Sequence, residues 1–296
     1  MSWLLAPVPR ARIAWLRLIA YLFLVVDMLM VTSSSLAHAR VPHDLYRPVL
    51  AARILHIPPP DLGVMWGLMT VVLGCGLACA TGRMPRAAGY LLGFACAAGY
   101  FWWVVISMSY GKVDHDHLAI VIALLVLPTA GPARFEDQTP CEAAGWAVRC
   151  VELAVVAAYF LSAWAKMRFG GPNWPNGSTL AWALQRRGTP PARHLLDYPW
   201  TLQISQWVTI IMEFSSPLLL ILRGRPRYAL AAFWAGFHVI TFAMMTISFL
   251  PHAIFLTAFL PLERLASRTQ VWRERARGGP AGQPVTVIGD QAVDTV

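Results

Sequence analysis

The feature that most constrains this chain is a series of eight apolar stretches separated by short breaks rich in Pro, Gly and Arg. The stretches cover Ile13–Val31, Leu62–Thr81, Ala87–Ser109, His117–Thr129, Ala143–Lys166, Gln203–Leu222, Tyr228–Phe249 and His252–Leu262. Most have the ~20 residues that a helix needs to cross a hydrocarbon core. The fourth and the last are shorter, which suits a tilted or partly embedded helix. The sequence therefore predicts an all-α, polytopic transmembrane helical bundle of about eight helices.

The composition agrees with a chain that faces lipid. It is 57% hydrophobic and 13% charged, whereas a soluble domain carries roughly 25% charged residues. The net charge of +9 comes from Lys and Arg that lie mostly between the apolar stretches and at the two ends. That distribution indicates orientation signals and contacts with anionic lipids rather than nucleic acid. Four of the five cysteines fall inside apolar stretches, and neither a CxxC pair nor a metal-type Cys/His spacing occurs, so no metal is expected.

The short loops predict the orientation. Arg83 and Arg86 follow the second stretch, and Arg223, Arg225 and Arg227 follow the sixth, while the loop after the seventh has no Lys or Arg. The positive-inside rule then places both termini in the cytoplasm of a multi-pass protein of the cell membrane. We expect a transmembrane domain over residues 1–265 and a cytoplasmic tail over 266–296, first basic, then polar and disordered.

The first apolar stretch has two interpretations. Arg10 and Arg12 precede it and Ala37-His38-Ala39 follows it, which is the pattern of a cleavable signal. However, Asp27 interrupts its apolar core, and the stretch is long for a signal. A retained helix is the favoured interpretation.

Some of the ionisable residues at membrane depth have an ordinary structural explanation. Arg149 and Glu152 are three residues apart on one helix and are expected to pair. Arg17 lies near the inner end of its helix, where it can extend to the interface. Asp27 is expected to be hydrated near the outer interface.

Four other ionisable residues are harder to explain and suggest a site. Lys166 ends the fifth stretch and His115 precedes the fourth, so helix parity puts both on the outer side. Glu213 and His238 lie near the middle of the sixth and seventh stretches, without a charge partner on their own helix. In a water-poor pocket the ammonium form of a lysine is disfavoured, and the free amine can act as a base. From position alone, an interfacial anchor remains the alternative for Lys166.

The order of several short motifs resembles that of a known family. Tyr159 is followed by Lys166 seven residues later and then by Trp174-Pro175-Asn176-Gly177. This spacing resembles the Y-x6-K…W-x-x-G signature of the HTTM (horizontally transferred transmembrane) family, whose domain is shared with vitamin K-dependent γ-carboxylase. Three further segments resemble the family's N-H-x-Y-L, E-x3-P and F-H…I-G-x-F…P elements: His115–Leu118, Met212–Pro217, and Phe237-His238 with Thr246–Phe249 and Leu260-Pro261.

The resemblance implies roles for particular residues. Lys166 corresponds to the base that deprotonates vitamin K hydroquinone, and His115 to the histidine that stabilises an anionic intermediate. Glu213, His238, His117 and Trp174 are expected to line the substrate pocket. The sequence departs from the family pattern at Asp114, His117 and Ser248, where the family has Asn, Tyr and Gly.

Two classes of function therefore stand at the level of sequence. The first is a carboxylase-like lyase or oxygenase with a lysine base, which uses a quinol such as menaquinol and modifies a lipid, a quinone or an exported peptide. Without the large lumenal domain of animal carboxylases after the last helix, an animal-type glutamate carboxylase is not expected. The second is a non-catalytic membrane protein, such as a quinone- or lipid-binding subunit or a peptide-maturation accessory factor. A small transporter is disfavoured because no inverted repeat with broken helices is seen.

Overall fold

The computed structural model describes residues 3–32 and 34–265, and the predicted tail over 266–296 lies outside them. The described chain is helical almost throughout, which confirms the predicted fold class. Its two strands, β1 (Val8–Pro9) and β2 (Pro140–Cys141), are two residues long and pair antiparallel.

Within residues 3–32 and 34–265, six helical segments are long and apolar enough to cross a membrane. They contain α1 (Arg10–Val26, extended by a π turn over Asp27–Val31), α4 (Leu62–Ala80), α5 (Arg86–Met108), α7 (Glu142–Gly170), α10 (Pro199–Ser215, followed by α11, Leu218–Ile221) and α12 (Gly224–Met245). Two shorter apolar segments, His115–Ala130 and Leu250–Phe259, coincide with the short fourth and eighth stretches.

The shorter elements connect these helices or complete the two short segments. The α-helical ones are α2 (Ser34–His38), α3 (Leu50–Ile54), α6 (Leu118–Val126), α8 (Ser178–Arg187), α9 (Pro190–Arg193) and α13 (Leu250–Ala253). Turns of 3₁₀ helix cover His43–Leu45, His115–His117, Leu127–Ala130, His194–Asp197 and Ile254–Phe259.

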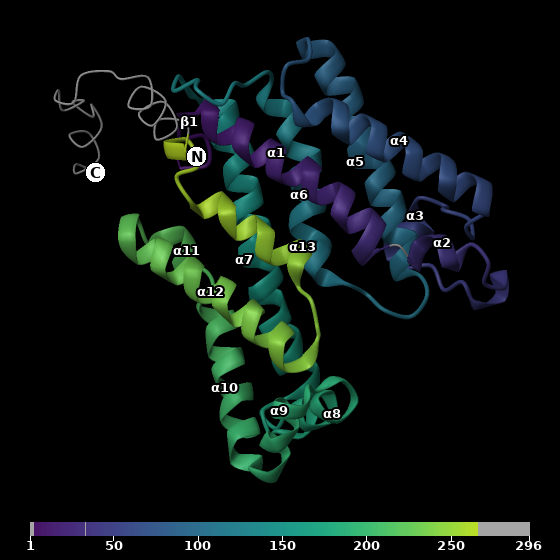
Figure 1. Cartoon of the computed structure of the whole chain (residues 1–296), viewed down its shortest axis with the longest axis vertical. Helices are drawn as coiled ribbons and strands as arrows, with labels where there is room; N and C mark the ends of the chain where they lie inside the picture. Colours follow the sequence, from purple (N-terminus) through teal and green to yellow (C-terminus); the bar gives the residue numbers. More distant parts are fainter. Residues whose placement is uncertain (1–2, 33, 266–296) are drawn as a thin grey trace.

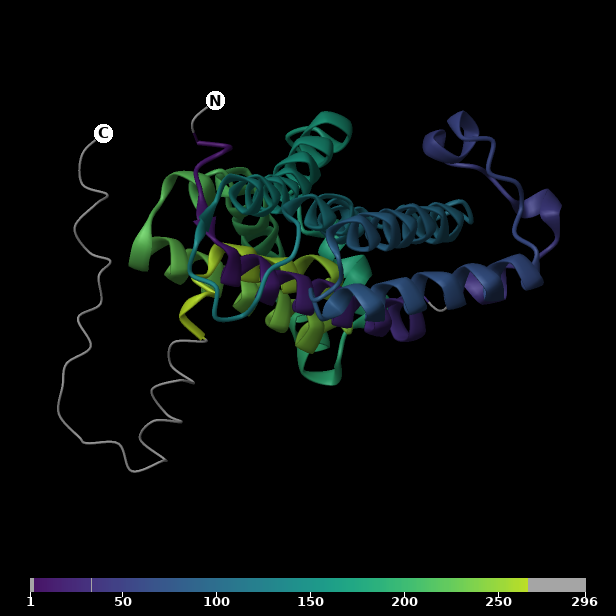
Figure 2. The same ribbon diagram turned by 90° about the horizontal axis from the view of Figure 1, so that it is seen from above.

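Helices α1 and α7 form the centre of the bundle. Helix α1 packs against α4, α6 and α7, while α7 packs against α6, α10 and the turn Ile254–Phe259 (Figure 1). Helices α4 and α5 lie side by side, and the segment between α2 and α4 projects at one side of the bundle (Figure 2). Ile13, Leu16 and Leu24 of α1 are fully buried, as the interpretation of the first stretch as a retained helix requires.

Much of the outer surface of the helices is apolar. Large side chains on α4, α5, α10 and α12 are between one third and three quarters exposed, among them Trp66, Leu91, Ile211 and Ile240. A soluble protein rarely leaves so continuous an apolar surface uncovered. The arrangement is that of helices that face hydrocarbon.

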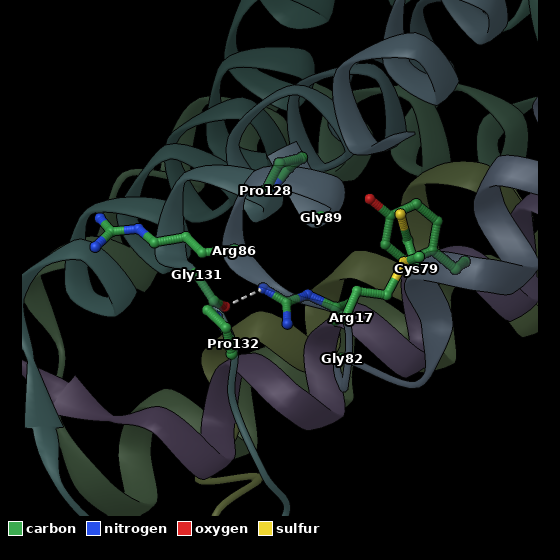
Figure 3. A pocket seen from close by; sticks show the side chains of 10 residues that line it. Arg17, Cys79, Gly82, Arg86, Gly89, Pro128, Gly131 and Pro132 are labelled. Carbon is green, nitrogen blue, oxygen red and sulfur yellow. Dashed lines mark hydrogen bonds between the residues drawn. The ribbon is translucent and has the colours of Figure 1, made fainter. Parts of the chain in front are cut away.

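Arg17 is buried rather than extended to the interface, which corrects the expectation for this residue. Its guanidinium donates to the carbonyl oxygens of Leu127 (3.1 Å) and Gly131 (2.8 Å), as Figure 3 shows for Gly131. These carbonyls lie where Pro128 ends the regular helix α6 and leaves acceptors without partners. The cavity beside Arg17 measures only about 30 Å³, so we assign this arginine a structural role.

Candidate functional site

A cavity of about 570 Å³ lies between α7, α8, α10 and α12. This volume falls within the range of roughly 300–1,000 Å³ that is typical of small-molecule sites. Most of its wall is apolar and comes from α8, α10 and α12, including Leu180, Ile204, Val208, Ile240 and Met244. The polar side chains of the wall come from α7, α10, α12, α13 and the turn at His115. The cavity therefore combines a large apolar surface with a few polar groups.

Lys166 and Glu213 form an ion pair in the wall of this cavity. The Lys166 ammonium donates to both carboxylate oxygens of Glu213, at 2.5 Å for Oε2, and the Ser162 hydroxyl also approaches Oε1 at 3.5 Å. The Glu213 side chain is 10% exposed and that of Lys166 is 23% exposed. Glu213 thus holds a cationic partner from another helix, Lys166 of α7.

The loop after α7 places Trp174 beside Lys166. The Lys166 nitrogen lies 5.4 Å from the centre of the Trp174 ring, within the range of a cation–π contact. Gly170 makes room for this ring, because a Cβ there would lie 2.5 Å from Trp174 Cδ1. Gln206 of α10 fixes the loop by accepting from the Gly177 amide (2.5 Å) and donating to the Trp174 carbonyl (3.3 Å).

His238 and His252 line the same cavity, and three of their four ring nitrogens are buried without a partner among the described residues. His238 Nε2 is hydrogen-bonded to the Tyr159 hydroxyl (2.6 Å), but its Nδ1 has no partner among the described residues. Neither ring nitrogen of His252 has a partner there either, although this side chain is 3% exposed. The two rings lie 5.9 Å apart, and the Tyr159 ring packs edge-on against His252 at 4.2 Å. Because buried polar atoms are nearly always satisfied, these nitrogens indicate a place for a polar ligand group.

The turn His115–His117 brings two of its three residues to the cavity. His115 and Asp116 line it, whereas His117 does not. A 3₁₀ helix has three residues per turn, so successive side chains point in different directions. His117 instead hydrogen-bonds to Asp116 and Asp27 on the side away from the cavity. Five of the six residues that the sequence suggested line one cavity: Lys166, His115, Glu213, His238 and Trp174. The sixth, His117, does not line it.

The sequence interpretation missed Tyr159, Asp116 and His252 as cavity residues and placed Asp27 wrongly. His252 opens the last apolar stretch and could have been found by the same rule that selected His238. Asp27 is fully buried rather than hydrated, because Tyr100, Thr32 and His117 supply its hydrogen bonds. Two of those partners, Tyr100 and His117, come from other segments, which the sequence does not place beside Asp27. Among the described residues, no group of three or more His, Cys, Asp or Glu is arranged to hold a metal ion.

Comparison with known families decides the identity of the domain. Residues 6–264 match the family profile described as the HTTM domain. The chain belongs to the HTTM family. With its apolar helices, it is an integral membrane protein of that family. No curated protein and no solved structure matches the chain.

Residues from all four motifs that carry the family resemblance line the cavity of this HTTM domain. Lys166 and Trp174 come from the first motif, His115 from the second, Glu213 from the third and His238 from the fourth. These segments are spread over more than half of the domain, yet their polar side chains line one cavity. The arrangement offers an amine–carboxylate pair, several imidazoles and an apolar wall for one ligand.

Proposed function

We propose that this HTTM protein is an enzyme of the cell membrane that binds a quinol, such as menaquinol, and removes a proton from it. The observation that carries the proposal is the pairing of Lys166 with Glu213 in the wall of a cavity that is also lined by His252, whose two buried ring nitrogens have no partner among the described residues. An apolar wall suits a quinol ring and its isoprenoid tail, and the polar groups suit its two hydroxyl groups.

The paired residues can supply a base in a place with little water. When the Lys166 ammonium passes a proton to Glu213, the ion pair becomes a neutral amine and a neutral carboxyl. The amine can then take the hydroxyl proton of the substrate, and the Lys166 ammonium that results stands beside the new anion. His115 lies close enough to interact electrostatically with Lys166 and can donate a hydrogen bond to the same anion.

A deprotonated quinol reacts readily with oxygen, and this reaction would drive the modification of a second substrate. We propose that this second substrate is a lipid, a quinone or an exported peptide, because the site lies near the predicted outer face of the membrane. In the orientation that the charge of the loops predicts, both termini are cytoplasmic and the chain crosses the membrane several times.

A second candidate function is binding without catalysis. It is favoured by the contact of the Lys166 ammonium with both carboxylate oxygens of Glu213, because the same ion pair can serve only to hold α7 and α10 together. In this case the protein would hold a quinone or lipid for a partner in the maturation of a secreted peptide.

The experiment compares the wild type, Lys166→Met and Arg168→Met in lipid nanodiscs. Arg168 lies on the same helix but is exposed and lies outside the cavity, so it is a matched control. Binding of a short-chain menaquinone is followed by quenching of tryptophan fluorescence, and menaquinol-dependent oxygen uptake by an oxygen electrode. We expect binding by all three proteins, and oxygen uptake that falls about 100-fold or more in Lys166→Met alone.

Three results would contradict the proposal in different ways. A wild type that does not bind the quinone would overturn the ligand class. Binding without oxygen uptake would establish the non-catalytic function instead. Equal oxygen uptake by the wild type and Lys166→Met would remove Lys166 from the reaction.

A further inference from the structure

Behind the cavity wall, His117 bridges two carboxylates. Its Nδ1 lies 3.2 Å from Asp116 Oδ1, and its Nε2 lies 3.1 Å from Asp27 Oδ1. The His117 side chain is 3% exposed and that of Asp27 is fully buried. We call Asp116, His117 and Asp27 the buried triad. Its members come from the turn before α6 and from the π turn that follows α1.

Asp27, the fully buried member of the triad, is fixed by several hydrogen bonds. Asp27 Oδ2 accepts from the Tyr100 hydroxyl (2.8 Å) and the Thr32 hydroxyl (3.0 Å), and Trp103 Nε1 donates to Thr32 at 2.9 Å. With the His117 ring on Oδ1, both oxygens of Asp27 have donors.

The geometry fixes the number of protons in the buried triad. An ionised carboxylate can only accept, so each contact between His117 and a carboxylate needs one proton. Two bridging protons leave the triad with one net negative charge, whichever atom carries each of them. One further proton would make it neutral.

Asp116 is the member of the triad where that further proton can bind. It lines the cavity, whereas Asp27 is enclosed. Its only side-chain partner among the described residues is His117, whereas Asp27 has three. The titratable groups that face it across the cavity are His115 of the same turn, His238 of α12 and His252 of α13, all of which interact with it electrostatically.

We propose that Asp116 is a second proton acceptor of the cavity, and that His117 and Asp27 position it and keep it negatively charged. The proposal rests on the proposed removal of a proton from a bound hydroxyl group. In this step the O–H bond of the ligand breaks, its electron pair stays on the ligand oxygen, and the proton forms the Asp116 carboxyl group. The ligand gains the negative charge that the triad loses, so charge is conserved.

A ligand with two hydroxyl groups makes use of two acceptors. Lys166 and Asp116 belong to different elements of the wall, α7 and the turn before α6. Each can serve one end of a quinol ring. The family pattern that the sequence resembles has Tyr where this chain has His117, so the bridging imidazole is one of the chain's departures from that pattern.

Infrared spectroscopy of the protein in nanodiscs, without ligand, tests where the proton binds. On acidification we expect a protonated-carboxyl band that Asp116→Asn removes. Asp27→Asn takes away one negative charge and should move the appearance of the band to lower pH. His117→Tyr, which restores the residue of the family pattern, takes away the positive charge and should move it to higher pH. Asp114→Asn, two residues before Asp116 and partly exposed, is the control and should leave this band unchanged.

The outcomes separate this proposal from the proposed function. A titrating band that Asp27→Asn removes and Asp116→Asn keeps, or no band that depends on Asp116, overturns the assignment of the proton acceptor. Failure of quinone binding by the wild type overturns the proposed function and leaves the infrared result intact. Where both hold, Asp116→Asn should lower menaquinol-dependent oxygen uptake by about tenfold or more while quinone binding is kept.

Discussion

Charged side chains inside this bundle are paired, and the manner of pairing separates structural residues from candidate functional ones. Glu152 is fully buried between Arg149 and Arg227, and Arg17 is satisfied by backbone carbonyls. Lys166 is paired as well, but its partner lies in the wall of the cavity. His252 stands apart because neither of its buried ring nitrogens has a hydrogen-bond partner in the part of the chain that the structure describes. A buried polar group without a partner lowers stability, so its retention points to a ligand.

Replacement of His252 by Phe tests this interpretation. Phenylalanine keeps a flat ring but removes two buried nitrogen atoms, so the free energy of unfolding should stay the same or rise by about 1 kcal/mol. Quinone binding should weaken by about tenfold, because one hydrogen bond to the ligand is lost. Thermal unfolding followed by circular dichroism and quenching of tryptophan fluorescence measure the two effects.

The matched control for this change is His194→Phe, since His194 is exposed in the turn after α9. His194→Phe should change neither the free energy of unfolding nor the affinity for quinone. A His252→Phe protein that unfolds at a much lower temperature, or that binds quinone as the wild type does, would show that His252 serves packing only.

At the scale of helices, Glu152 joins α7 to the start of α12. Arg149 of α7 donates to its Oε2 at 2.5 Å, and Arg227 of α12 is paired with its Oε1. Glu152→Gln keeps the size of the side chain but leaves two guanidinium groups without a negative partner. We expect the free energy of unfolding to fall by about 3–5 kcal/mol. Chemical unfolding in detergent measures the loss.

Glu142→Gln, at the exposed start of the same helix, is the control for this change and should have little effect. An equal effect of the two substitutions would show that the buried ion pairs do not hold α7 and α12 together.

The contact of α5 with the turn Leu127–Ala130 depends on a glycine. A Cβ on Gly93 would lie 2.5 Å from Cγ of Pro128, whose ring cannot rotate away. Gly93→Ala should therefore lower the free energy of unfolding by about 1–3 kcal/mol. Gly67→Ala on α4, where a Cβ would meet no atom within 4 Å, should not lower it. Similar melting temperatures for the two variants would contradict the predicted clash.

The helices could be predicted from the sequence because their length is set by the apolar runs. The stretch Leu62–Thr81 became α4, Leu62–Ala80, and Ala87–Ser109 became α5, Arg86–Met108. The sequence predicts that the seventh helix continues to Phe249, because Thr246–Phe249 is as apolar as the residues before it. The structure ends α12 at Met245, and Thr246 adopts a left-handed conformation there.

At the scale of the whole molecule, the partners of the site could not be derived. Position and motif order selected Lys166, Glu213, His115 and His238, but periodicity carries no information about contacts between helices. Lys166 and Glu213 are 47 residues apart, and Asp27 and His117 are 90 apart. The sequence predicts a hydrated Asp27 because two of its three hydrogen-bond partners, Tyr100 and His117, lie in other parts of the chain.

The distribution of charge over the whole molecule predicts its orientation in the membrane. Arg83 and Arg86, which lie between α4 and α5 and at the start of α5, should face the cytoplasm, as should Arg223 before α12 and Arg225 in its first turn. The segment around Lys112 should face outward. Both Lys112 and Arg225 are exposed, and all five natural cysteines are free thiols. Single cysteines at these two positions, in a protein whose own cysteines are replaced by alanine, therefore report the sidedness directly. In intact cells a membrane-impermeant maleimide should label Lys112→Cys, and should label Arg225→Cys only after the membrane is permeabilised. The reverse pattern would place the cavity with Lys166 and His115 on the cytoplasmic side, and would exclude an exported peptide as the substrate modified there.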